Sequence, residues 1–180
     1  MYGAVRSCEC CSATMMNILG GGKNTANTLD FQKFMIVPVG EFSVAESLQM
    51  CTEVYHTMEQ VLKELGRSTY ISDEGGFMPN LVSNEEALAV ILGAIQKAGY
   101  KPGEQIALAI EVAASDYFEG GEYNFPGEGF IRTPDEMVEY YARLVEEYPI
   151  LSIQGGMASN DRQGWALLIE RLGSQIQIER

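Results

Sequence analysis

The sequence predicts a parallel α/β fold in which strands and helices alternate along most of the chain. Short apolar runs typical of buried strands recur, and amphipathic segments with helix start and stop signals separate most of them. One run, QIALAIE, is apolar nearly throughout, as expected in a parallel sheet covered on both faces. The 180 residues form one domain but are short for a complete eight-stranded barrel, which takes roughly 250 residues.

Two strands and a helix are expected first. Apolar runs at 15–19 and 33–39 predict the strands. Ser43 followed by Glu46 is a capping-box signature, and the helix that it opens ends at Gly66. The buried stripe expected on this helix consists of Val44, Leu48, Cys51, Tyr55, Met58, Leu62 and Leu65.

A second helix, a buried strand and a hairpin are expected next. Ser83 and Glu86 form another capping-box signature, and Gly99 ends the helix. Residues 105–111 predict the buried strand, and residues 115–129 an irregular hairpin with two glycines at its tip.

The last third of the chain predicts helix, strand, helix and strand. Thr133 supplies an N-cap, Pro134 suits the first helical turn, and Glu136 completes a capping box. The expected elements are a helix from 134 to about 148, a strand at 149–153, a helix ending at Gly173 and a strand from 176. Alternation of this kind favours parallel strands joined by right-handed crossovers.

Composition limits the function. The net charge of −13 argues against a nucleic-acid surface, and the lack of a long apolar run argues against a membrane span. We therefore expect a soluble cytoplasmic protein. Cys8, Cys10 and Cys11 lack the paired spacing of a metal site, so incidental reduced thiols are favoured over a metal or disulfide role, while Cys51 is expected in the core.

Candidate site residues follow the predicted strands, where parallel α/β sheets form their sites. They are the glycine-rich segment 20–27, Lys33, Asp73, Glu74, Glu111 and the segment 154–156. Acidic positions beside a glycine-rich loop suit a divalent cation and an anionic ligand. GGGKNT is not a P-loop, because Asn24 stands where Ser or Thr is needed, and His56 lies inside a predicted helix.

Several long motifs make the sequence resemble the enolase family, the phosphopyruvate hydratases of glycolysis. They include MMNILGGGKNTANTLDFQKFMIVPVG, DEGGFMPNL, AGYKPGE, YFEGGEY and MVEYYARLVEEYPILSI. The resemblance runs from about residue 15 to residue 178. It implies a partial enolase-type TIM barrel of ββαα(βα)n order, with about five of eight strands and without the N-terminal capping domain. We expect residues 15–180 to form this part and residues 1–14 to be a divergent segment.

The resemblance also implies a chemistry, Mg2+-assisted dehydration of 2-phosphoglycerate to phosphoenolpyruvate. Glu74 matches the family's general acid. Lys33 occupies the position of a family glutamate near that acid, and Asn24 occupies the position of a family histidine in a substrate loop. At the metal site, Glu111 stands for an aspartate and Gln154 for a glutamate. The lysine base and a third metal ligand correspond to positions beyond the last residue given.

These replacements make the family site more positive. Glutamate to Lys33, glutamate to Gln154 and aspartate to Gly155 together change the net charge by +4. Mg2+ is held mainly by carboxylates, waters and substrate phosphate, so we expect poor binding here. Lys33 is expected to approach Glu74, and an opposite charge favours the carboxylate form over the protonated form that a general acid needs.

Several alternatives stay open. Asp73 either brackets its loop or has a functional role; Glu111 is either a vestigial ligand position or a solvated charge; and Gln154 is most simply a neutral filler. For the whole chain, we interpret the sequence as a truncated, divergent enolase-family protein that is inactive or severely impaired. The alternatives are a non-catalytic interaction module that pairs with itself or with an intact enolase, and a gene remnant.

Overall fold

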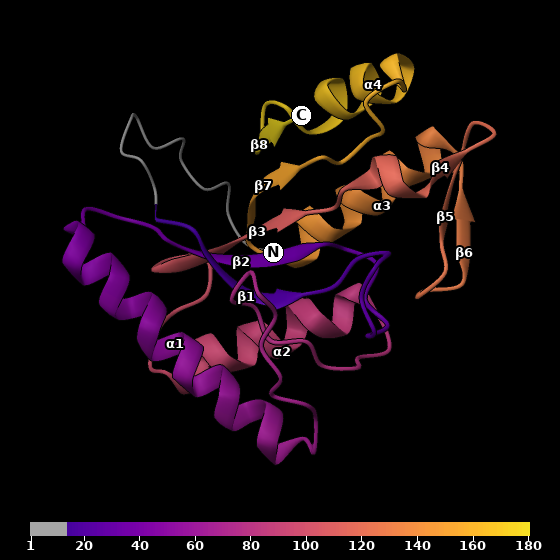
Figure 1. The fold of residues 1–180 in the computed structure, drawn as a ribbon. Helices are drawn as coiled ribbons and strands as arrows, with labels where there is room; N and C mark the ends of the chain where they lie inside the picture. Colours follow the sequence, from indigo (N-terminus) through magenta and orange to yellow (C-terminus); the bar gives the residue numbers. More distant parts are fainter. Residues whose placement is uncertain (1–13) are drawn as a thin grey trace.

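The computed structural model describes residues 14–180 (Figure 1). Residues 1–13, with the clustered Cys8, Cys10 and Cys11, lie outside the described part, so the expectations about those thiols and about the divergent segment remain predictions.

Five strands of residues 14–180 form the main sheet, in the order β1-β2-β3-β7-β8. They are β1 (Met16–Gly20), β2 (Lys33–Pro38), β3 (Ile106–Glu111), β7 (Ile150–Gln154) and β8 (Gln177–Glu179). β2 runs antiparallel to both its neighbours, whereas β3, β7 and β8 run parallel to one another. This order confirms the predicted partial barrel. Within residues 14–180 the sheet does not close, and β1 and β8 are its edges.

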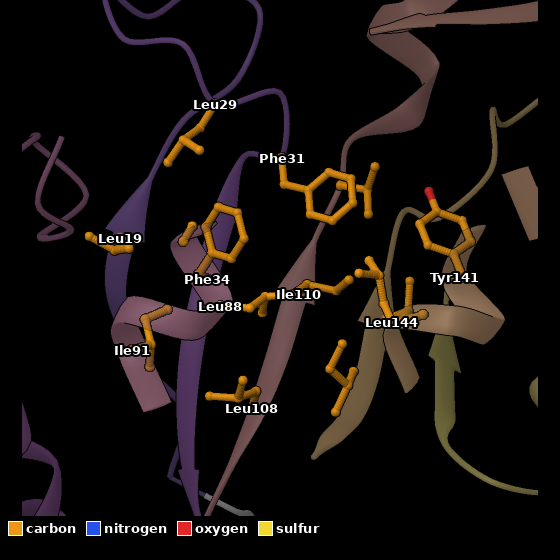
Figure 2. Close-up of a cluster of buried hydrophobic side chains, with 14 of the residues drawn as sticks. Leu19, Leu29, Phe31, Phe34, Leu88, Ile91, Leu108, Ile110, Tyr141 and Leu144 are labelled. Atoms are coloured by element: carbon orange, nitrogen blue, oxygen red, sulfur yellow. The ribbon is translucent and has the colours of Figure 1, made fainter. Parts of the chain in front are cut away.

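In the described part of the chain, four helices cover the sheet: α1 (Val44–Glu64), α2 (Asn84–Lys97), α3 (Pro134–Glu147) and α4 (Arg162–Leu172). Figure 1 shows α1 and α2 below β1 and β2, and α4 beside β7 and β8. Alternate strand residues face these helices and form one large core. Figure 2 shows part of it, with Leu19, Phe34, Leu108 and Ile110 from the strands, Leu88 and Ile91 from α2, and Tyr141 and Leu144 from α3.

The intervening residues of the strands form a second, smaller cluster on the other face of the sheet. Met35, Val37 and Ala109 are buried there, and Met15 and Leu151 pack against them. None of the helices of residues 14–180 is both long and apolar enough to cross a membrane.

The predicted stripe of α1 is correct in the middle and wrong at its ends. Cys51, Met58 and Leu62 are buried as expected, but Val44, Leu48 and Leu65 are exposed. A helix of 21 residues is about 31 Å long, whereas the strands of 5 and 6 residues that it covers reach about 20 Å. The helix therefore extends past the surface against which its ends would pack.

Two of the three predicted capping boxes are complete, at Ser43 and Thr133. Of the third predicted capping box, at Ser83, only one of the two hydrogen bonds forms. The Ser83 hydroxyl accepts from the Glu86 amide, but the Glu86 carboxylate accepts from the amide of Val82 instead of closing back onto Ser83. The N-cap of α2 is therefore made by Ser83 alone.

The predicted hairpin is part of a small antiparallel sheet. Its strands are β4 (Phe118–Glu119), β5 (Glu122–Phe125) and β6 (Phe130–Arg132), and a 3-10 helix η1 (Ala114–Tyr117) precedes them. The tip lies at Gly120 and Gly121 as predicted, and both have positive φ. The third strand, β6, was not expected, because its exposed Phe130 and Ile131 lie in a segment rich in turn residues.

A buried carboxylate anchors this small sheet to the loop before β2. Asp30 Oδ1 accepts from the amide of Gly127 at 2.9 Å, and Asp30 Oδ2 from the amide of Glu128 at 2.9 Å. Its main-chain oxygen accepts from the Tyr117 hydroxyl at 2.7 Å. Two segments almost a hundred residues apart are thus joined just before the strand that carries Lys33.

Candidate functional site

An ammonium group lies between two carboxylates at one end of the main sheet. The Nζ atom of Lys33 is 3.0 Å from Oε2 of Glu111 and 3.2 Å from Oε2 of Glu74. The side chains of Lys33 and Glu111 are 25% and 28% exposed, and that of Glu74 is 54% exposed. The three charges therefore form a cluster that is partly shielded from water.

The strand directions explain how Lys33 meets Glu111. Lys33 opens β2 and Glu111 closes β3, and the two residues are directly paired in the antiparallel register. The first residue of β2 thereby lies at the carboxyl end of β3. In a parallel α/β sheet this is the end at which sites form, so the antiparallel second strand delivers its first side chain to the site.

A tight turn carries Glu74 to the same place. We call residues Ser72–Gly76 the acidic loop. The amide of Ser72 donates to the oxygen of Gly76 and the amide of Gly75 donates to that of Ser72, both at 2.9 Å. Gly75 has a φ of +87°, which a residue with a Cβ adopts only with strain. Gly76 approaches β1 so closely that an added Cβ would lie 2.8 Å from Nδ2 of Asn17.

The cluster stabilises the charged form of its lysine. The pKa of Lys33 is raised, first by the hydrogen bond to Glu111 and further by the one to Glu74, while partial burial opposes the rise. Because the folded pKa is above the unfolded value of about 10.4, the stability that the ammonium contributes is fully present below that pH. It is lost only as the pH rises through the folded pKa, so Lys33 is a cation at neutral pH.

Gln154 places an amide, not a carboxylate, beside the cluster. It ends β7 and pairs in register with Glu111. Its Nε2 donates to the sulfur of Met15 at 3.9 Å. The following Gly155 has a φ of +55° and donates its amide to the oxygen of Glu179. This corner of the site therefore contains a neutral side chain followed by a residue without one.

The remaining predicted residues are exposed at the surface. Asn24 is exposed in the loop between β1 and β2, and its neighbour Lys23 donates to the oxygen of Asp116 at 2.7 Å. Asp73 is exposed in the acidic loop. His56 is an exposed residue of α1, as a helix residue without a site role would be.

Sequence reasoning missed two side chains that hold the acidic loop. Asn17 Nδ2 donates to the main-chain oxygen of Glu74 at 3.3 Å, and the hydroxyl of Tyr55 donates to the oxygen of Gly75 at 2.8 Å. The signal for Asn17 was its polar side chain inside the apolar run MMNIL. Tyr55 was assigned to the buried stripe of α1, and its half-buried ring with a polar tip fits both that stripe and the loop contact.

A comparison with protein families identifies the family of this chain. The family model described as "Enolase, C-terminal TIM barrel domain" matches residues 10–179. The chain belongs to the enolase family. The resemblance inferred from the motifs and the partial barrel that it implies are thereby confirmed, whereas the roles given to single residues remain predictions.

The residues of this enolase-family chain do not fit the Mg2+ that the family uses. Among the described residues, no group of three or more His, Cys, Asp or Glu is placed to hold a metal ion. Of the predicted ligand positions, Glu111 is a carboxylate but binds the Lys33 ammonium, and Gln154 contributes an amide whose nitrogen points to Met15. An ammonium that contacts the one suitable carboxylate repels a divalent cation and competes for the same oxygens.

Proposed function

We propose that this chain is a non-catalytic member of the enolase family that does not dehydrate 2-phosphoglycerate. The observation that carries the proposal is the position of Lys33, whose ammonium bridges Glu74 and Glu111. By family resemblance these are the positions of the general acid and of a metal ligand. One side chain therefore engages two groups that the family reaction needs free.

The chemistry at each group supports the proposal. A general acid must be free to reach the leaving group of the substrate, and Oε2 of Glu74 is engaged by the Lys33 ammonium at 3.2 Å. A metal ligand must offer free lone pairs, and one oxygen of Glu111, Oε2, is engaged by Lys33, 3.0 Å away. The proposal also includes a cytoplasmic location, which rests on the family and on the acidic composition.

The test is an assay for phosphoenolpyruvate with 2-phosphoglycerate and excess Mg2+. We expect turnover at least about 10⁴-fold below that of an intact enolase, because residues that act as a unit are lost together. The double variant Lys33→Glu, Gln154→Glu returns two of the family's carboxylates to the site, and any gain in turnover over the natural chain would assign the loss to these two positions. A rate within about tenfold of an intact enolase would contradict the proposal. Lys63→Glu, an equal charge change on α1, is the matched control.

A further inference from the structure

We propose that Lys33 is an internal latch, an ammonium that holds the acidic loop against β2 and β3 without any divalent cation. The inference rests on the proposed function in one respect, which is that the site binds no divalent ion. It goes further by assigning a conformational role to the residue that prevents catalysis.

The latch joins three segments that are distant in sequence. Lys33 belongs to β2, Glu111 to β3, and Glu74 to the acidic loop. Of the two ion pairs, the one with Glu111 links neighbouring strands that are already hydrogen-bonded in register. The one with Glu74 is the contact that ties the loop to those strands, so the loop is where losing the ammonium has its effect.

The acidic loop is fixed at its base, and its tip is held by side-chain hydrogen bonds from Asn17 and Tyr55 in addition to the ion pair of Glu74. Just after the loop, Phe77 exchanges main-chain hydrogen bonds with β1, to Ile18 and from Gly20, and its ring stacks on Tyr55 at 4.6 Å. In the tip, Asp73, Glu74 and Gly75 are all exposed. Exposed segments with few buried contacts are those that open locally, and side-chain contacts then decide how often they do so.

Removing the ammonium reverses the sign of the interaction at the tip. Both carboxylates lie within 3.2 Å of one nitrogen atom, so without it Glu74 and Glu111 face each other as like charges. Repulsion then favours an open loop, and a cation shared by the two carboxylates favours a closed one. Replacing Lys33 by a neutral side chain should therefore create a cation-sensitive loop where the natural chain has an insensitive one.

The test is amide hydrogen exchange of the acidic loop in the full chain and in Lys33→Met. We expect exchange of the loop amides to be about tenfold faster in the variant, with β3 amides unchanged. Adding MgCl2 or CaCl2 should slow the amide exchange of the loop in Lys33→Met. It should not slow that exchange in the natural chain or in the double variant Lys33→Met, Glu74→Gln. Lys63→Met removes an exposed lysine of α1 and should behave as the natural chain.

The outcomes separate the two proposals. Equal loop exchange in Lys33→Met and the natural chain would overturn the latch and leave the proposed function intact. If Mg2+ slowed the amide exchange of the loop in the natural chain, the claim that the site binds no divalent ion would be overturned. Should Lys33→Met fail to fold, NaCl applied to the natural chain replaces it: added salt should speed the exchange of the loop but not that of β3, and an unresponsive loop would overturn the latch.

Discussion

Replacing Asp30 by alanine is expected to lower the free energy of unfolding by about 3 kcal/mol. The carboxylate is buried and accepts from the amides of Gly127 and Glu128, one on each oxygen. Alanine leaves both donors without a partner and makes a small cavity. Buried donors without partners are each destabilising by about 1–3 kcal/mol, so two of them dominate the effect.

Urea denaturation followed by circular dichroism measures this change. Burial raises the pKa of the Asp30 carboxyl, and the two amide hydrogen bonds oppose that rise. A neutral side chain of the same shape is therefore tolerated better, and Asp30→Asn, which keeps one acceptor, should lose about half as much as Asp30→Ala. Asp135→Ala, at an exposed position of α3, is the control and should change little. Equal stability of Asp30→Ala and the natural chain would contradict the anchoring role.

Reversing the charge of Lys33 with Lys33→Glu is expected to lower the free energy of unfolding by about 2 kcal/mol at low ionic strength. The variant loses both ion pairs and places three carboxylates together. Partial exposure of all three side chains limits the effect, because water screens them. The loss should shrink as salt is added, because salt screens the repulsion among the three carboxylates.

The same denaturation experiment, run at several salt concentrations, tests this expectation. Lys63→Glu makes the same change in net charge at an exposed position whose partner, Glu59, is one helical turn away. It should be destabilising by less than about 1 kcal/mol. A Lys33→Glu variant no less stable than Lys63→Glu would show that the cluster contributes nothing beyond surface charge.

Much of the fold could be predicted because its signals are local. The N-caps at Ser43 and Thr133 and the glycines at the hairpin tip are set by hydrogen bonds and backbone angles within a few residues. The ends of α1 could not be predicted, because their exposure depends on how far the strands beneath them extend. The hydrogen-bond partner of Glu86 could not be predicted either, because its carboxylate accepts from the amide of Val82 and not from that of Ser83, the next residue.

The candidate site also contains contacts that could be predicted and contacts that could not. The approach of Lys33 to Glu74 was expected from the family resemblance, and the structure confirms it at 3.2 Å. The register of β2 and β3 adds Glu111 as the closer partner of Lys33. Glu111 is therefore an ion-paired side chain and not a freely solvated charge. Asn17 and Tyr55 were missed as loop contacts, because both hydrogen bonds reach across the fold to main-chain oxygens, and nothing in the sequence shows which loop they meet.

Calorimetric titration of Mg2+ into the natural chain tests most directly the claim that an ammonium stands where the family holds a metal ion. We expect no saturable heat up to about 10 mM Mg2+, because Lys33 engages Glu111 and Gln154 offers no carboxylate. Saturable one-to-one binding that is abolished by Glu111→Gln would contradict the account, since it would place a divalent cation on the carboxylate that Lys33 holds.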